Sequence, residues 1–373
     1  EKAYMTKKEV LIITTSLNLG GSEIQSVRLA NMLVKQNYSV RFLYLKRDED
    51  IKSLLSSEVE VQGLNLVISK PRVLDYIKAV YNYIISVVAI QKSVNKSTVI
   101  ISFLVHASIT GFIISKLSGC KHIVSIRSDR FTKRKKQEVY FRKLIMKYIC
   151  KSSTYIVFNS DKSLNKFNND FKIQEKSLVI KNIITSGKVL FDEKKFSNKK
   201  LRGMYVGRFD NLKNLENLIL STKNQLRNNV KIDFFGEGRN RLNYKKIIDE
   251  NNLKNIISIE GLSLDIISNS KEYDFLILTS FHEGLPNVVI EAMNNYLPVI
   301  STRVGEVTRL LDNSRGLFID GFSEIDIETA ILDFQHLPLD IKKNMIIKSK
   351  EYIDQEFSND VVFQNWETLI KSL

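Results

Sequence analysis

The sequence predicts an α/β protein with two doubly wound domains, each built on a parallel sheet. Short apolar runs rich in β-branched residues alternate with helical stretches, a pattern typical of parallel strands covered by helices. The alternation pauses near residue 184 and resumes near residue 201. A chain of 373 residues is also too long for one ordinary core and long enough for two. We therefore expect one α/β domain in each half.

The strand candidates fall into two series. In the first half they lie at 9–15, 38–45, 98–104, 121–126 and 154–159, and in the second half at 201–209, 231–236, 257–261, 274–280 and 298–303. A Gly20-Gly21-Ser22 turn follows the first strand, with Ser22 as the expected N-cap of a helix. The polar segment 184–200 is the expected linker. We place the domains at 1–187 and 188–356, followed by a helical stretch to the C-terminus.

Composition narrows the class of protein. An apolar content of 43% with only four prolines favours a folded chain. Cys120 and Cys150 form neither a disulfide framework nor a metal-ligand spacing, so we expect both to be buried in a protein of the reducing cytosol. We see no signal peptide and take Met5 as the native start. The longest apolar run, 81–90, is far shorter than the roughly 20 residues that span a bilayer.

The net charge of +15 is concentrated in one half of the chain. Residues 1–190 contain 32 Lys and Arg against 14 Asp and Glu, whereas residues 191–373 contain 24 against 27. Such an asymmetry indicates that the N-terminal half faces a polyanion, either an anionic membrane or a nucleic acid.

The segment FHEGLPNVVIEAM, at 281–293, is the most informative in the chain. Pro286 marks an expected helix start, so the N–H groups of Asn287 and Val288 would point out of the helix end and form an anion site. Gly284 would let a ligand approach the backbone closely. Glu283 and Glu291 flank the turn and could accept hydrogen bonds from hydroxyls on either side of the anion. A nucleotide diphosphate sugar has that chemistry, although two exposed glutamates on a solvated helix would give the same pattern.

A second motif, YVGRFDNLKN at 205–214, places two cations after a strand. Arg208 lies just past the strand's carboxyl end and Lys213 five residues on, where ligands of open α/β sheets collect. Two cations near the Pro286 turn could neutralise a diphosphate without a metal ion. Taken alone, the pair could equally be ordinary surface charges.

With FFGEGRNRL at 234–242 and LNLGGSEIQSVRLANML at 17–33, these blocks resemble the retaining glycosyltransferases of family 4, the Glu-x7-Glu type, in order and spacing over nearly the whole chain. The resemblance implies a GT-B fold of two Rossmann-like domains facing across a cleft. It also implies metal-independent hexosyl transfer with retention and no cofactor beyond the nucleotide sugar donor. In this family the last helix, here about 357–373, packs back on the first domain, where Trp366 would anchor it.

The resemblance also assigns roles to individual residues. Arg208 and Lys213 match the family's diphosphate-binding pair, Glu283 the donor-sugar contact and Glu291 the ribose contact. The remaining expected donor-binding positions are Gly284, Leu285, Asn287, Val288, Gly236, Gly20 and Gly21. The glycines of FGEGRN do not make a dinucleotide fingerprint, because Arg241 stands where a third glycine is required.

Two residues of the first half are candidates for the acceptor side of the cleft. His106 follows a predicted strand. Arg127 stands where many family members have a His, and a guanidinium is a poor general base because it stays protonated. Arg127 could still bind a phosphate or a sugar hydroxyl. We expect His122 to be structural.

The segment from Arg127 to Lys151 combines ten basic residues with two acidic ones. Apolar residues, including Leu144, Ile145 and Tyr148, recur there at helical spacing, which suits a helix on an anionic lipid surface. The alternative is that the apolar stripe belongs to the domain core. The residues that we expect to face the membrane are Arg130, Lys133, Arg134, Lys135, Lys136, Arg142 and Lys143.

The leading hypothesis is a cytoplasmic enzyme, peripheral on the inner face of the membrane. It would move a sugar from a nucleotide diphosphate, most often UDP in this family, to a polyprenyl-diphosphate-linked saccharide in surface polysaccharide assembly of the O-antigen or capsule type. One alternative is a non-catalytic, basic, nucleic-acid-binding protein of Rossmann type. Another is a GT-B-like sugar-nucleotide epimerase, which would need no lipid acceptor.

Overall fold

A computed structural model describes residues 8–18, 20–46, 49–64, 73–127, 136–185, 200–224, 226, 229–263 and 266–373, with the backbone alone for 73–80 and 136–141. These residues form two compact units. The first comprises Glu1–Ile183 together with Asn359–Leu373, and the second comprises Ile184–Ser358. The sequence analysis had placed the boundary at 187/188 and the linker at 184–200, of which 186–199 lie outside the described residues.

The first unit is built on a parallel seven-stranded sheet in the order β3-β2-β1-β4-β5-β6-β7. Val10 of β1 pairs with Val40 of β2 on one side and Val99 of β4 on the other, so β1 and β4 lie at the centre. The strands are β1 (Glu9–Thr14), β2 (Ser39–Tyr44), β3 (Glu60–Gly63), β4 (Val99–Phe103), β5 (Lys121–Ile126), β6 (Tyr155–Phe158) and β7 (Ser177–Val179).

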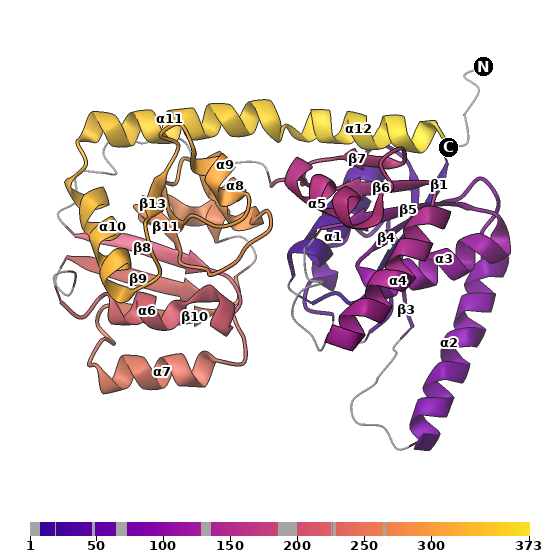
Figure 1. Cartoon of the computed structure of the whole chain (residues 1–373), viewed down its shortest axis with the longest axis horizontal. Helices are drawn as coiled ribbons and strands as arrows, with labels where there is room; N and C mark the ends of the chain where they lie inside the picture. The colour runs from indigo at the N-terminus through magenta and orange to yellow at the C-terminus, as the bar shows by residue number, and fades with distance from the viewer. Residues whose placement is uncertain are drawn as a thin grey trace. The chain divides into compact units, whose positions relative to one another are not determined.

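Alternate residues along these strands pack against helices on opposite faces of the sheet (Figure 1). Val10 and Ile12 contribute to the core under α1 and α12, whereas Leu11 and Ile13 contribute to the core under α2 and α3. Trp366 of α12 is fully buried in the first of these cores. The helices are α1 (Gly21–Lys35), η1 (Lys52–Leu54), α2 (Val73–Ser93), α3 (Val105–Ser118), α4 (Lys136–Ser152), α5 (Asp161–Phe171) and α12 (Asn359–Lys371).

The second unit repeats this design with six parallel strands in the order β10-β9-β8-β11-β12-β13. Its strands are β8 (Leu201–Val206), β9 (Val230–Phe235), β10 (Ile257–Gly261), β11 (Phe275–Leu278), β12 (Val299–Thr302) and β13 (Leu317–Ile319). One face is covered by α6 (Leu215–Leu220), α7 (Arg241–Glu250) and α10 (Glu324–His336). The other is covered by η5 (Ile267–Glu272), α8 (Asn287–Asn294), α9 (Val307–Leu311) and α11 (Leu339–Glu356). The predicted pair of doubly wound α/β domains is therefore confirmed.

The chain is held on both sides of the point where it first passes between the units. The side-chain amide of Gln25 in α1 donates to the Ile183 carbonyl at 2.9 Å and accepts from the Ile183 N–H at 2.7 Å. Arg28 Nη1 also donates to that carbonyl at 2.9 Å. In the second unit, Asn294 Nδ2 of α8 donates to the Thr185 carbonyl at 2.9 Å. The backbone on each side of Ile184 is thus fixed to its own unit.

Several local expectations can be compared with the structure. Helix α1 begins at Gly21 with Gly20 as its N-cap, so the assignment of Ser22 as the cap was wrong. Ser22 is buried in the first turn of the helix, and no side chain caps the helix. Cys120 and Cys150 are both buried free thiols, as expected, and burial raises the pKa of Cys150 to about 12. No helix among the described residues is both long and apolar enough to cross a bilayer.

Candidate functional site

The candidate site lies where the strand order of the second sheet changes direction. Strands β8 and β11 are neighbours at its centre, and the chain leaves them toward helices on opposite faces, α6 after β8 and α8 after β11. In open α/β sheets this arrangement leaves a crevice outside the carboxyl ends of the two strands, where ligands bind. Both motifs singled out in the sequence follow these two strands.

Direct hydrogen bonds join the loops after β8 and β11. The N–H of Phe281 donates to the carbonyl of Leu212 at 2.9 Å. The hydroxyl of Thr279 donates to the Lys213 carbonyl at 2.8 Å. The short helix η4 (Asn211–Lys213) ends at Asn214, whose φ of 55° turns the chain sharply into α6. These contacts fix the backbone of Lys213 beside the loop that carries Glu283.

The side chains of Lys213 and Glu283 meet in an ion pair. Lys213 Nζ lies 2.5 Å from Glu283 Oε1, and the side chains are 17% and 12% exposed. The Ser280 hydroxyl donates to the same carboxylate oxygen at 2.6 Å. Because water screens a mostly buried pair less than a surface pair, this attraction is stronger than that of an ordinary surface salt bridge. Two residues predicted for the site, 70 positions apart in sequence, are thus in contact.

Arg208 lies on the same loop and is more exposed. Its guanidinium is 46% exposed, and Nη2 lies 3.9 Å from Asp210 Oδ2. The buried hydroxyl of Tyr205 donates to the Arg208 carbonyl at 3.0 Å. Burial raises the pKa of Tyr205 well above its ordinary value, and the nearby carboxylates of Glu283 and Asp210 raise it further. Tyr205 therefore stays protonated and holds the backbone of this cation loop.

Helix α8 begins beside the ion pair. Its N-cap is Pro286 and its first residue is Asn287, one position later than predicted. The N–H groups of Val289 and Ile290 bond back to the Pro286 carbonyl at 3.2 and 3.4 Å, and the positive dipole end of the helix favours an anion. The first turn contains no acidic residue. The end of α8 next to Glu283 thus has the electrostatic character of an anion site, and Glu291 lies one turn further inside.

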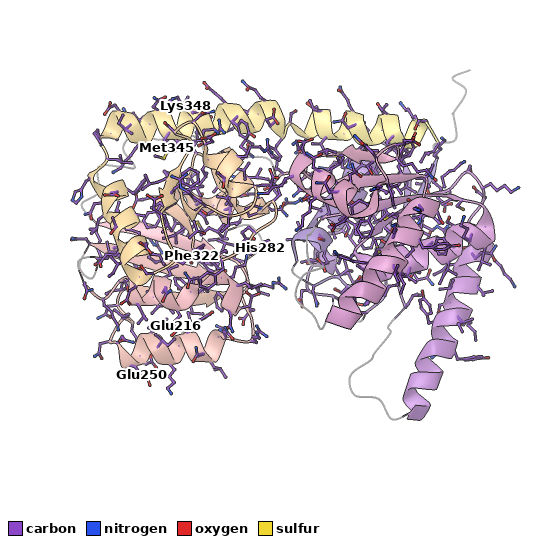
Figure 2. The ribbon with its side chains drawn as sticks, in the orientation of Figure 1. Glu216, Glu250, His282, Phe322, Met345 and Lys348 are labelled. Atoms are coloured by element: carbon purple, nitrogen blue, oxygen red, sulfur yellow. The ribbon has the colours of Figure 1, made fainter. Side chains whose placement is uncertain are left out.

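The residues between Glu283 and α8 divide into two kinds. A side chain added at Gly284 would meet nothing within 4 Å, so there is open space beside its backbone. Leu285, in contrast, is buried in the core under α8, and Val288 packs against that core. Any contact of Leu285 with a donor would therefore use its backbone. Figure 2 shows His282 on the same loop, at the carboxyl-end edge of the sheet.

Gly305, which the sequence analysis did not select, supports the loop from behind. Its φ is +54°, and a Cβ there would lie 2.1 Å from the Glu283 carbonyl oxygen. The N–H of Glu306 donates to the Gly284 carbonyl at 3.0 Å. The glycine is therefore needed for the close approach that positions Glu283. Its only sequence signal is a lone glycine after a strand.

The glycines of FGEGRN have a packing role in the structure. A Cβ on Gly236 would lie 1.9 Å from the Gly207 carbonyl oxygen, and one on Gly238 would lie 2.4 Å from that of Phe209. The loop after β9 therefore packs directly on the loop that begins with Arg208. Two main-chain hydrogen bonds hold the loops together. The Gly207 N–H donates to the Phe235 carbonyl at 3.0 Å, and the Phe209 N–H donates to the Glu237 carbonyl at 2.9 Å.

In the first unit, the predicted cleft residues follow the central strands β1 and β4. Gly20 and Gly21 precede and begin α1, and His106 is an exposed residue in the first turn of α3. Leu104, just before α3, has φ 72° and ψ 163°, a backbone conformation that is costly for a residue with a side chain. The change of strand order in this sheet thus coincides with these candidates.

Arg127 is engaged within its own unit. Its Nε donates to Ser125 at 2.9 Å, and its Nη1 donates to the Ile180 carbonyl at 3.0 Å and to Asn182 Oδ1 at 2.9 Å. Its guanidinium lies 5.8 Å from the ring of Trp366, and burial lowers the pKa of Arg127 to about 9. These contacts give Arg127 a structural role between β5, the segment after β7 and α12. His122, expected to be structural, is fully buried in β5, with its pKa lowered to about 3 by burial.

The predicted membrane-facing residues can be followed only in part. Arg130, Lys133, Arg134 and Lys135 lie outside the described residues, as does the side chain of Lys136. Arg142 is half-buried, and Lys143 pairs with Asp170 at 3.3 Å.

The chain is similar to several known proteins. A family model described as "Glycosyl transferases group 1" matches residues 188–352. The chain is 24% identical over 236 residues to the poly(ribitol-phosphate) alpha-N-acetylglucosaminyltransferase of Staphylococcus aureus, covering 60% of this chain and 47% of that protein. It is 24% identical over 177 residues to the amylovoran biosynthesis glycosyltransferase AmsD of Erwinia amylovora, covering 47% and 49%. The matches thus span about half the length of these curated relatives.

Among solved structures, Anabaena Alr3699/HepE in complex with UDP-glucose superposes with a TM-score of 0.81 at 17% identity, covering 98% of this chain and 100% of that one. At this identity the likeness shows the fold, which is that of GT-B glycosyltransferases. The family model over residues 188–352 thus describes glycosyltransferases, both curated relatives are glycosyltransferases, and AmsD is named for amylovoran biosynthesis.

Proposed function

We propose that this chain is a retaining, metal-independent glycosyltransferase. It moves a hexose or N-acetylhexosamine from a UDP-linked donor to a polyprenyl-diphosphate-linked saccharide. It acts in the cytoplasm, peripherally on the inner face of the cytoplasmic membrane, in the assembly of a surface polysaccharide such as O-antigen or capsule. The observation that carries the proposal is the Lys213–Glu283 ion pair, 2.5 Å long, beside the N-terminus of α8.

The donor's diphosphate is bound by positive charge from three sources. The Lys213 ammonium and the Arg208 guanidinium come from one loop, and the positive dipole end of α8 follows the other. Charge-assisted hydrogen bonds to phosphate are each worth about 1.5–3 kcal/mol. The open space beside Gly284 lets the donor lie close to the backbone.

The flanking carboxylates bind hydroxyl groups. Glu283 accepts hydrogen bonds from the donor sugar, and Glu291 accepts them from the ribose. When Lys213 binds the diphosphate, the Ser280 hydroxyl, 2.6 Å from Glu283 Oε1, still orients the Glu283 carboxylate. The ion pair and the Ser280 hydroxyl therefore hold both residues at the donor site.

Transfer breaks the bond between the anomeric carbon and the oxygen of the β-phosphate. The new bond forms on the same face of the sugar, from the acceptor hydroxyl oxygen to the anomeric carbon. The acceptor proton passes to the departing phosphate oxygen, so no protein nucleophile is required. Lys213, Arg208 and the N-terminus of α8 stabilise the negative charge that develops on the leaving UDP.

The choice of UDP and of a hexose or N-acetylhexosamine has support in the relatives. HepE is described in complex with UDP-glucose, and the Staphylococcus aureus relative is named for N-acetylglucosaminyl transfer to poly(ribitol-phosphate).

Thermal unfolding with a panel of UDP- and GDP-sugars tests the donor. A ligand at 100 times its dissociation constant stabilises a protein by about 2.7 kcal/mol, so a UDP-sugar should raise the Tm clearly. The stabilising donor is then incubated with lipid-linked saccharide, and the product's anomeric configuration is determined by NMR. Glu283→Gln should retain UDP binding and lose transfer. A chain that no nucleotide sugar stabilises, or an inverted product, would overturn the proposal.

A further inference from the structure

Helix α2 has two apolar faces, and within the part of the chain that the structure describes only one of them packs against its own unit. Val87 and Ile90 are buried in the core under α2 and α3. A second stripe has the spacing i, i+3, i+4, i+7, the pattern of one helix face. It consists of Tyr81, Ile84, Ile85 and Val88, which are 64%, 54%, 48% and 39% exposed.

Helix α4 has the same property. Met146, Ile149 and Cys150 are buried, whereas Leu144, Ile145 and Tyr148 are exposed. The three exposed residues line an open apolar groove of about 420 Å³, together with Ile109, Phe112, Ile113 and Ile149. The rings of Phe112 and Tyr148 meet edge to face with centroids 5.6 Å apart. The apolar stripe predicted for α4 therefore belongs partly to the core and partly to the surface.

Helix α3 lies between these two helices and contacts both (Figure 1). The Tyr83 and Thr110 hydroxyls, 2.8 Å apart, join α2 to α3, and Leu117 of α3 is also exposed. We name as the α2–α3–α4 face the residues Tyr81, Ile84, Ile85, Val88, Leu117, Leu144, Ile145 and Tyr148. Among the side chains described in the first unit, Val361 is the only exposed large hydrophobic outside this face. Clustering on that scale marks a surface that has a partner.

Charge identifies the kind of partner. The sequences of α2, α3 and α4 contain eight Lys or Arg residues and two acidic ones. A second copy of the chain would set one basic face against another, and like charges across an interface disfavour association. An anionic bilayer attracts both the basic and the apolar side chains of the face. Lipid phosphates pair with the lysines, and the apolar side chains enter the boundary between headgroups and acyl chains.

We propose that the α2–α3–α4 face is the surface by which the protein docks on an anionic membrane. Tyr81, Ile84 and Ile85 of α2 enter the boundary between headgroups and acyl chains, as do Leu144, Ile145 and Tyr148 of α4. Lys116, Lys147 and Lys151 remain at the level of the lipid phosphates. The biological purpose of this docking rests on the proposed lipid-linked acceptor, but the surface is defined without it.

Sedimentation with vesicles tests the surface directly. The vesicles contain phosphatidylcholine with 30% phosphatidylglycerol or phosphatidylcholine alone. Wild-type protein should sediment with the anionic vesicles, less so at high salt, and much less with the neutral ones. Leu144→Gln/Ile145→Gln/Tyr148→Gln and Ile84→Gln/Ile85→Gln should each lower the partition coefficient at least tenfold. Lys147→Ser/Lys151→Ser should lower it severalfold and weaken its salt dependence.

A matched control removes exposed apolar side chains from the second unit. Leu242→Gln/Ile325→Gln should sediment like wild type, since these residues are exposed but outside the face. Thermal stabilisation by UDP is measured for every variant and should be unchanged, so that loss of docking is separated from loss of folding or of the donor site. Wild-type partitioning by both apolar variants overturns the proposal. So does a concentration-dependent dimer that the same variants abolish, or binding to RNA in preference to the vesicles.

Discussion

We predict that substitutions of Lys213 and Glu283 have coupled effects on UDP affinity. The loss of one isolated contact would not produce such coupling. Lys213 pairs with Glu283 at 2.5 Å, and in the proposed complex it also binds the donor's diphosphate. Lys213→Ala removes a charge-assisted bond worth about 1.5–3 kcal/mol, which weakens UDP binding about 10- to 100-fold. It also leaves the mostly buried Glu283 carboxylate without its cation.

That carboxylate then repels the ligand. Two like charges about 6 Å apart, at an effective dielectric constant between those of a protein surface and water, repel by roughly 1 kcal/mol. Removing the charge with Glu283→Gln in the Lys213→Ala background should therefore restore UDP affinity by about 3- to 10-fold. Glu283→Gln alone should change UDP affinity by less than about threefold, because Lys213 is then free to serve the phosphate.

Isothermal titration of UDP and of uridine with the wild type, both single variants and the double variant completes the cycle. Uridine should bind all four proteins with similar affinity, since it has no phosphate. If the two substitutions act additively on UDP, Lys213 and Glu283 do not share a diphosphate site. If Lys213→Ala weakens uridine as much as UDP, the contact is not to phosphate.

Three further predictions concern the scaffold. Gln25→Leu should lower the free energy of unfolding by about 1–3 kcal/mol in urea titrations, because the Ile183 N–H loses its buried acceptor. Arg28 still donates to the Ile183 carbonyl. The control Gln36→Leu, on the exposed end of α1, should have little effect. Gly305→Ala should destabilise the fold by about 2 kcal/mol or more, since it combines positive φ with a backbone clash. Gly284→Ala should keep the wild-type Tm and weaken UDP-sugar binding. Equal Tm values for the two variants would contradict this account. Since burial lowers the pKa of His122 to about 3, the unfolded state binds this proton first, and stability should fall as pH drops from about 6.5 toward 3 at up to about 1.4 kcal/mol per pH unit. His122→Gln should flatten that slope in thermal unfolding, and the exposed His336→Gln should not.

Much of the fold could be predicted because central parallel strands have a strong signal in sequence. Strands such as β1, β4 and β11 are buried on both faces and therefore appear as continuous apolar runs. The strands that the pattern missed are β3, β7 and β13, which have three or four residues and lie at sheet edges. A short edge strand is only partly buried, so its sequence resembles that of a loop.

The residue types of the site could be predicted from the sequence, but the contacts that join them could not. The contact of Lys213 with Glu283 depends on the Phe281–Leu212 hydrogen bond between loops, whose donor and acceptor are backbone groups and leave no sequence signal. The role of Arg127 depends on acceptors at Ile180 and Asn182, more than 50 residues away, one of which is a carbonyl. Gly305 supports Glu283 only because two loops approach closely, and spacing alone cannot reveal that approach.

The two units place different residues at the same position of one scaffold. Both sheets change direction between the same pair of strands, β1 and β4 in one and β8 and β11 in the other. In the second unit, that position carries the Lys213–Glu283 pair and a helix end without acidic residues in its first turn, which suits a diphosphate. In the first unit, the corresponding position carries Gly20, Gly21 and His106. Leu104, two residues before His106, has a costly backbone conformation. Such strain persists only where the surrounding structure imposes it, and here the Ser108 N–H and hydroxyl both bond to the Leu104 carbonyl at 2.9 Å. The corresponding position of the first unit thus presents glycine backbone and the exposed His106 where the second unit presents a cation and a carboxylate.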